Sequence, residues 1–204
     1  MRKLIASTFV SLDGVMQSPS GPLEDPAGGF ALGGWVSTYG DEIMARPGSG
    51  LDGKGRDLVL GRKTYEIFEA YWPYQPADNP AAISLNAAKK YVASRTLTTL
   101  GWNNSSLLDG EVAAAISKLK SQDGNDLQII GSANLIQTLQ SASLIDEYNI
   151  WTIPVVLGRG KRLFESTSKA VALRLVNSQA SITGVLFSTY APVGPVPTGS
   201  FVPA

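Results

Sequence analysis

Three segments of the sequence place small, hydroxyl-bearing or cationic residues directly after a short apolar run that predicts a strand. They are the segments 61–64, 94–96 and 131–135. In the first and third, an amphipathic pattern follows at once, so the segment would form the first turn of a helix. Free N–H groups in such a turn attract phosphate, and guanidinium and hydroxyl groups strengthen the attraction. Each segment therefore has anion-binding character.

Arg62 and Lys63 further favour anion binding at the first of these segments. A cation in the first turn of a helix opposes the helix dipole, so their position is better explained if an anion binds there. Three such segments at one edge of a sheet suit a ligand with several phosphates, such as NADPH. The glycine pattern G-x-G-x-x-G, typical of Rossmann domains, is missing, which disfavours that fold.

The composition excludes most other chemistry. The chain has no histidine and no cysteine, so serine–histidine triads, thiol nucleophiles and ordinary zinc sites are ruled out. We expect no metal site, and a cofactor that carries the reactive bond fits best. With 17 basic and 17 acidic residues, no net charge recruits nucleic acid or a membrane surface. The lack of cysteine makes a cytoplasmic setting the default expectation.

The chain alternates between predicted strands and predicted helices, which favours a mixed, mostly parallel sheet covered on both faces. Strands are expected at 3–12, 57–61, 90–94, 105–108, 126–130 and 148–158, and helices at 35–45, 62–72, 111–121 and 132–142. The ranges 170–176 and 182–190 predict a C-terminal antiparallel hairpin. We expect one domain over 1–191 and an irregular Pro/Gly-rich tail over 192–204.

Several residues are predicted to punctuate these elements. Asp109 and Ser132 are the expected caps of the last two helices, and Gly124 is expected to end the first of these. Pro154 indicates an edge strand or a bulge. The segment 16–55 is dense in glycine and proline and is a candidate substrate-side lid.

The sequence IIGSANLIQTLQSASLIDEYNIWTIPVVLGRGKRLF (129–164) resembles the reductase domain of bacterial riboflavin-biosynthesis deaminase-reductases and their stand-alone relatives. STFVSLDGVM (7–16), DPAGGFALGGWVSTYGDE (25–42), LVLGRKTYEIF (58–68) and VASRTL (92–97) extend the resemblance over nearly the whole chain. It implies the three-layer α/β/α fold of the dihydrofolate reductase superfamily and an NADPH-dependent reductase. The zinc deaminase half of the bifunctional enzymes needs His and Cys, so this chain cannot contain it.

The resemblance also implies roles for particular residues. Arg95, with Ser94, would contact the 2′-phosphate of NADPH, and the other two segments would contact its pyrophosphate and nicotinamide side. The expected cofactor-binding residues are Gly61, Arg62, Lys63, Thr64, Ser94, Arg95, Thr96, Gly131, Ser132, Ala133, Asn134 and Leu135. Dihydrofolate reductases carry a second glycine where this chain has Ser132.

On the substrate side, Asp13 matches an acidic residue at the end of the first strand in riboflavin-type reductases. It is the expected proton donor or substrate anchor; the alternative is a turn aspartate before Gly14. Trp35 and Tyr39 are candidates for stacking on a flat heterocycle, with helical core packing as the alternative. Asp41 and Glu42 are expected to be exposed, with substrate contact as the alternative. The basic run 158–162 is expected to form a solvated turn, with contact to a substrate phosphate as the alternative.

The leading hypothesis is an NADPH-dependent reductase of a small pyrimidine- or pterin-like substrate. The nearest activity that the resemblance implies is reduction of 5-amino-6-(5-phosphoribosylamino)uracil. Dihydrofolate reduction and a non-catalytic NADPH-binding module are the alternatives. Members of the family commonly dimerise, so a homodimer is expected.

Overall fold

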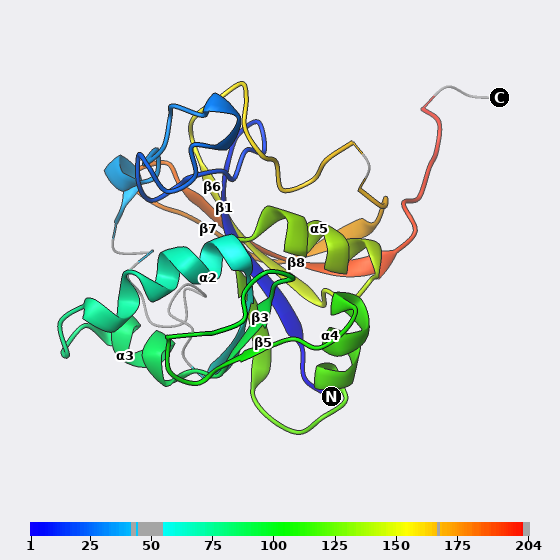
Figure 1. Ribbon diagram of the computed structural model, residues 1–204. Coiled ribbons are helices and arrows are strands. Elements are labelled where there is room, and N and C mark those ends of the chain that lie inside the picture. The colour runs from blue at the N-terminus through cyan, green and yellow to red at the C-terminus, as the bar shows by residue number, and fades with distance from the viewer. Residues whose placement is uncertain (42–43, 45–54, 167, 202–204) are drawn as a thin grey trace.

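The computed structural model describes residues 1–41, 44, 55–166 and 168–201 (Figure 1). Within these residues eight strands form one sheet. They are β1 (Leu4–Ser11), β2 (Arg56–Gly61), β3 (Lys90–Ala93), β4 (Ser105–Leu107), β5 (Asp126–Ile130), β6 (Glu147–Ile153), β7 (Ala172–Ala180) and β8 (Leu186–Gly194). Their order is β4-β3-β2-β5-β1-β6-β8-β7. The first six run parallel, whereas β8 is antiparallel to β6 and β7 is antiparallel to β8. The expected mixed, mostly parallel sheet with a C-terminal hairpin is confirmed.

Helices cover both faces of the sheet. They are α2 (Arg62–Glu69), α3 (Pro80–Ala87), α4 (Val112–Lys120) and α5 (Ala133–Ser141). Neighbouring residues of a strand point to opposite faces, and β2 shows what each face meets. Val59 packs in the cluster that holds α4 and α5, whereas Leu58 and Leu60 pack with Tyr65 of α2 and Leu85 of α3. These two apolar layers give the expected three-layer architecture.

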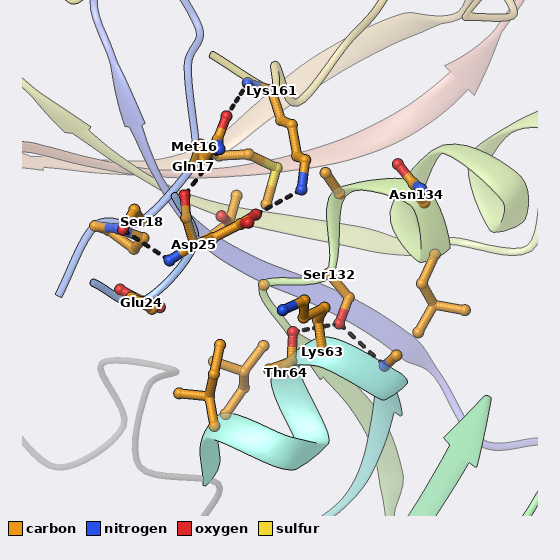
Figure 2. Close-up of a pocket in the computed structure, with 18 of the residues that line it drawn as sticks. Met16, Gln17, Ser18, Glu24, Asp25, Lys63, Thr64, Ser132, Asn134 and Lys161 are labelled. Atoms are coloured by element: carbon orange, nitrogen blue, oxygen red, sulfur yellow. Dashed lines mark hydrogen bonds and ion pairs between the residues drawn. The ribbon is translucent and has the colours of Figure 1, made fainter. Parts of the chain in front are cut away.

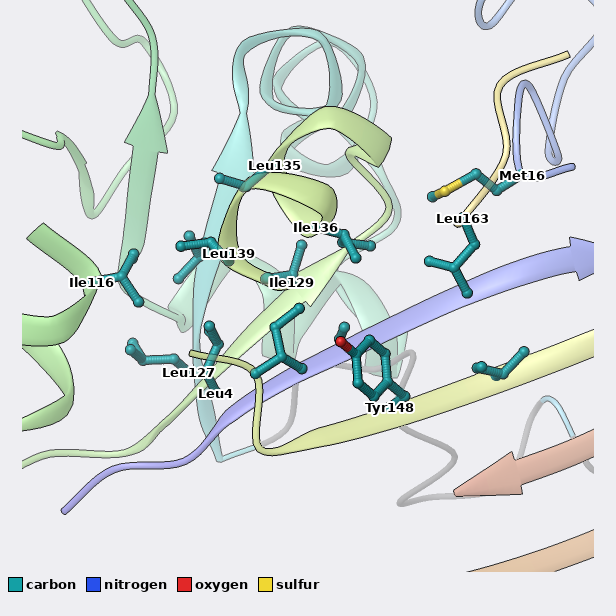
Figure 3. Close-up of a cluster of buried hydrophobic side chains, with 14 of the residues drawn as sticks. Leu4, Met16, Ile116, Leu127, Ile129, Leu135, Ile136, Leu139, Tyr148 and Leu163 are labelled. Carbon is teal, nitrogen blue, oxygen red and sulfur yellow. The ribbon is translucent and has the colours of Figure 1, made fainter. Parts of the chain in front are cut away.

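The larger core cluster holds α5 rigidly against the middle of the sheet (Figure 3). Ile136 and Leu139 of α5 are fully buried with Leu127 and Ile129 of β5. Complete burial of one such side chain stabilises the fold by about 1.5–3 kcal/mol. The position of the turn that leads from β5 into α5 is therefore fixed by the core beneath it.

The strand order brings the functional segments together. Because β2, β5 and β1 are parallel neighbours, their carboxyl ends lie at the same edge of the sheet. Gly61 ends β2, Gly131 follows β5, and Ser11 ends β1. The segments that follow these three strands therefore lie at one edge of the sheet, although they are far apart along the chain. The cavity described below lies at this edge.

Three predictions about helix and strand ends were wrong. Glu111 caps α4, because its carboxylate accepts hydrogen bonds from the N–H groups of Ala113 and Ala114; Asp109 does not. The same helix ends at Lys120, before Gly124. Strand β6 ends before Pro154 and lies between β1 and β8, so this proline marks neither an edge strand nor a bulge within it.

Other elements differ in extent. The hairpin strands lie two to four residues later than expected, so residues 192–194 belong to β8 and not to the tail. Helix α3 was not predicted; Asn79 caps it and Pro80 opens it. Of the helix expected at 35–45, Ser37–Tyr39 form a 3-10 turn, and residues 42–43 and 45 lie outside the described residues. Among the helices described, none is long and apolar enough to cross a membrane.

Candidate functional site

A cavity of about 430 Å³ lies at the shared carboxyl edge of β1, β2 and β5. Two of the three predicted phosphate-binding segments form part of its wall. The predicted cofactor residues that line it are Gly61, Arg62, Lys63, Thr64, Gly131, Ser132, Ala133, Asn134 and Leu135. Ser7, Thr8 and Phe9 of β1 and residues 16–20 of the segment after β1 also line it. The sheet thus places two helix N-termini, those of α2 and α5, around one cavity.

Ser132 joins the two helix N-termini (Figure 2). Its Oγ accepts a hydrogen bond of 3.0 Å from the backbone N–H of Gly61, and it lies 2.6 Å from Oγ1 of Thr64. The predicted role of Ser132 as a side-chain cap of α5 was wrong, because its hydroxyl makes no bond within that helix. A glycine at this position could not link the two loops.

The backbone around this link is unusual. Gly131 and Ser132 both have positive φ, 68° and 65°, which glycine adopts freely but serine rarely does. At Gly61 a Cβ atom would lie 3.0 Å from Oγ of Ser132, so a side chain there would push the serine away. The absence of a side chain at Gly61 therefore makes room for the hydroxyl of the strained Ser132.

The second predicted segment is not part of the cavity wall. Ala93, the last residue of β3, lines the cavity, but Ser94, Arg95 and Thr96 do not. The hydroxyl of Ser94 accepts hydrogen bonds from the N–H groups of Thr96 and Leu97, which closes a turn. Arg95 is exposed beside the cavity end of β3. Its contact with a 2′-phosphate stays a prediction.

Asp13 anchors two segments of chain and does not line the cavity. Its carboxylate accepts hydrogen bonds from the Ser11 hydroxyl at 2.6 Å and from the N–H groups of Leu157 and Gly158 at 3.0 and 2.8 Å. These bonds, the Ser11 hydroxyl first, lower the pKa of Asp13 to about 2. A carboxyl with that pKa is ionised at neutral pH and carries no proton to donate, so the structure does not support the expected proton donor. These hydrogen bonds are those of a turn aspartate, the alternative, and the role of Asp13 as a substrate anchor stays a prediction.

The two predicted aromatic stacking residues also lie outside the cavity wall. Trp35 is 9% exposed, packs with Trp151 and Val185, and donates from Nε1 to the carbonyl of Gln17. Tyr39 packs at the border of the same cluster. Core packing is therefore the role that the structure gives Trp35, and stacking on a substrate stays a prediction without support from the cavity.

Two charged residues of the cavity, Glu24 and Asp25, were missed as candidates, and a third, Lys161, was considered only as part of the basic run 158–162. Lys161 lies in the basic run that was expected to form a solvated turn, yet its Nζ is 2.5 Å from Oδ2 of Asp25. Gln17 strengthens the link, because its Oε1 accepts from the N–H of Lys161 and its Nε2 donates to the carbonyl of Asp25. The sequence around Glu24 has no periodicity that could have placed it. The only signal was the acidic pair within a glycine- and proline-dense segment.

The described residues of the site offer no set of ligands suited to a metal. Within the described part of the chain, no group of three or more His, Cys, Asp or Glu side chains could hold a metal ion. The polar groups of the cavity are backbone N–H groups, hydroxyls, three cations and two carboxylates. Such a set can bind an oxyanion at one side and hydrogen-bond donors at the other.

Comparison with known proteins places this geometry in a family. The model of the RibD C-terminal domain matches residues 2–187. Among curated proteins, the uncharacterized protein YyaP of Bacillus subtilis is 28% identical over 196 residues, which is 93% of this chain and 94% of that protein. The uncharacterized protein YwjB of the same organism is 26% identical over 177 residues, 85% of this chain and 89% of YwjB.

Solved structures agree in fold. A protein from Shewanella sp. PV-4, described as a candidate riboflavin biosynthesis protein, superposes with a TM-score of 0.68 at 21% identity, covering 94% of this chain and 99% of that one. A pyrimidine reductase-like protein from Corynebacterium diphtheriae gives a TM-score of 0.58 at 14% identity, over 94% and 92% of the two chains. Enterococcus faecalis dihydrofolate reductase, solved in a complex with NADP(H), gives 0.56 at 14% identity, over 93% and 96%. The fold is that of dihydrofolate reductase, and the chain belongs to the RibD C-terminal domain family.

Proposed function

We propose that this protein is an NADPH-dependent reductase that transfers hydride to a C=N or C=O bond of a small pyrimidine- or pterin-like heterocycle. The observation that carries the proposal is the link through Ser132, which holds the N-termini of α2 and α5 against one cavity. Two adjacent helix N-termini suit a ligand with two linked phosphates. The family membership supports a reductase.

The hydroxyl pair at this link fits a phosphate in a further way. Ser132 and Thr64 have two hydroxyl protons, and their mutual hydrogen bond uses one of them. Among the described residues, nothing accepts the other, whichever hydroxyl carries it. Both side chains line the cavity, so the remaining proton is available to an acceptor oxygen such as that of a phosphate.

Different residues of the cavity would then bind different parts of the cofactor. Arg62, Lys63 and the N–H groups that open α2 would hold one phosphate, and the turn 131–134 would hold the other. When bound, the cofactor supplies the hydride. Thr8 and Phe9 of β1 and Met16 would form the floor on which the reacting ring lies and would keep water from it.

Arg95 is proposed to distinguish NADPH from NADH. It is exposed next to the end of β3, where a guanidinium can reach a phosphate monoester without losing an existing ion pair among the described residues. Arg95→Ala should weaken NADPH binding by about 10-fold or more and leave NADH binding nearly unchanged. Equal losses for both cofactors would refute this assignment.

A titration with NADPH tests the proposal. We expect binding in the micromolar range or tighter, which is typical of nucleotide cofactors. Lys63→Glu should weaken binding strongly, whereas Lys118→Glu, a matched change at an exposed lysine of α4, should not. Absence of NADPH binding by the unmodified protein would refute the proposed function.

Substrate assays separate the candidate activities. The bound cofactor should be oxidised by 5-amino-6-(5-phosphoribosylamino)uracil or a related heterocycle, and dihydrofolate is the direct test of the alternative activity. If NADPH binds but no pyrimidine or pterin oxidises it, the protein is a non-catalytic NADPH-binding module. A homodimer is also proposed, and light scattering after size-exclusion chromatography measures it.

A further inference from the structure

The β7–β8 hairpin forms one end of the sheet and is largely exposed. Within the described residues, β7 has a neighbouring strand on one side only, and all seven residues from 174 to 180 are exposed. Of the 30 residues from 172 to 201, 18 are exposed. A stable protein–protein interface takes about 20–30 residues from each partner. This end of the molecule is therefore large enough to form one.

The same end of the chain is almost free of charge. Arg174 is the only charged residue between positions 172 and 201, although 17% of the whole chain is charged. Exposed strands at the end of a sheet usually carry lysine or other charged side chains, which prevent association. The centres of interfaces, in contrast, are depleted of charged residues. The composition of the hairpin is therefore that of a surface that a partner covers.

The two faces of the hairpin differ in polarity. Residues that are paired across antiparallel strands point to the same face. One face bears the pairs Leu175–Tyr190, Ser178–Ser188 and Ala180–Leu186. The other face of β7 bears Arg174, Asn177 and Gln179. Leu175 and Leu186 are 51% and 47% exposed, so the first face, called the hairpin face below, is apolar and open to solvent.

The segment that follows β8 also exposes apolar side chains. Figure 1 shows that residues 195–201 leave the body of the domain and extend into solvent. Within this segment Val196 is 50% exposed and Phe201 is fully exposed. An aromatic side chain in that position is covered only by contact with another molecule. The hairpin face and this segment thus present two uncharged, apolar surfaces on one chain.

We propose that the hairpin face and the segment 195–201 form the interface between two copies of this chain related by a two-fold axis. The inference is independent of the proposed reductase function, because no residue between 172 and 201 lines the cavity. In a two-fold interface the same surface meets itself, so an uncharged face needs no complementary charge on its partner. A nucleic acid or a charged protein surface would instead leave its own charges uncompensated against this face.

The shape of the hairpin face suits packing of one sheet on another. Ser178, Ala180 and Ser188 are small, so two such faces can approach to about 10 Å, the usual distance between packed sheets. Continuation of the sheet across the free edge of β7 fits less well. The pairing of β7 with β8 is shifted at Ala172/Leu173 and at Leu175/Asn177, and such irregularities twist an edge strand away from further pairing.

The test measures the mass of the full-length protein by light scattering after size-exclusion chromatography. It compares the unmodified protein with Leu175→Asp, which places a charge at the centre of the hairpin face. The matched control is Ile83→Asp on α3, because Ile83 is an aliphatic residue with a similar exposure of 55%. Phe201→Ser is a second variant, which changes the extended segment and leaves the packed part of the domain intact.

We expect the unmodified protein and Ile83→Asp to have twice the chain mass of 21.6 kDa at about 10 μM. Leu175→Asp should raise the dissociation constant of the dimer at least about 100-fold, because the substitution occurs twice in the interface. Phe201→Ser should raise it at least about 10-fold. The Tm of the unmodified protein should increase with protein concentration, and that of Leu175→Asp should not.

Two results would overturn the inference. One is an unmodified protein that stays monomeric at about 100 μM. The other is a dimer that Leu175→Asp and Phe201→Ser weaken no more than Ile83→Asp does. NADPH affinity of the Leu175→Asp monomer should stay within about threefold of the unmodified protein. A dimer that fails to bind NADPH would refute the proposed function and leave this interface standing.

Discussion

Replacing Ser132 separates the two things this residue does, since it bonds two loops and it adopts a strained backbone. Ser132→Ala removes the hydrogen bonds to Gly61 N–H and to Thr64 Oγ1 but keeps a Cβ at φ 65°. Each neutral hydrogen bond contributes about 0.5–1.5 kcal/mol. We therefore expect Ser132→Ala to lower the free energy of unfolding by about 1–3 kcal/mol.

Ser132→Gly loses the same two bonds but relieves the strain. A positive φ costs a residue with a Cβ about 1–2 kcal/mol, which glycine avoids. The greater flexibility of glycine in the unfolded chain offsets about 0.4–1 kcal/mol of this gain in stability. The glycine variant should thus be more stable than the alanine variant by about 1 kcal/mol. For a chain of this size that difference is about 2–4 °C in Tm.

Urea unfolding and thermal melts of the three proteins measure both differences. NADPH affinity should fall in both variants, because the helix N-termini are no longer held together. A Ser132→Ala protein as stable as the unmodified one, within about 0.5 kcal/mol, would refute the claim that this hydroxyl links the loops. A glycine variant less stable than the alanine variant would refute the assignment of strain.

Three further changes test the scaffold around the site. Asp13→Asn should lower the free energy of unfolding by about 1–2 kcal/mol at neutral pH. The fall in the pKa of Asp13 from 3.8 to about 2 corresponds to about 2.4 kcal/mol. The expected loss is smaller because solvent reaches part of the carboxylate. That contribution is present above pH 3.8 and is lost as the pH falls through about 2, so acid unfolding curves of the two proteins should converge there. Gly160→Ala should destabilise by more than about 2 kcal/mol in urea unfolding, because φ is 125° and the new Cβ would lie 2.6 Å from Cγ1 of Val15; unchanged stability would contradict the tight packing of this turn. Lys90→Met should lower Tm by several degrees, since the buried ammonium donates to three carbonyls that would lose their partner, and an unaltered melting curve would show that water replaces it.

The parts of the site that the sequence predicted are those that depend on local pattern. Gly61 and Gly131 stand where an apolar run gives way to a helical repeat, and the parallel direction of β2, β5 and β1 follows from the alternation of strands and helices, although their order in the sheet does not. The target of the Ser132 hydroxyl is 71 residues away along the chain, so no local pattern could distinguish this link from a helix cap.

The substrate side depends on contacts that have no local signature. Asp13 resembles a catalytic carboxylate in sequence, but it accepts hydrogen bonds from Leu157 and Gly158, which are 144 and 145 residues away and which no local pattern could indicate. Glu24 lies in a loop without regular hydrogen bonding, where the position of a side chain follows from packing and not from periodicity. Asp109 and Glu111 are both acceptable caps, and only the observed start of α4 at Val112 selects Glu111.

Mapping of NADPH onto the backbone amides by ¹H–¹⁵N NMR tests the central claim most directly. The largest shift changes should fall on the amides of residues 61–64 and 131–135, with smaller ones in β1 and none in the β7–β8 hairpin. This pattern would place the cofactor between the two helix N-termini that Ser132 joins. Saturating shift changes confined to other surfaces, or none at all with millimolar NADPH, would contradict the account.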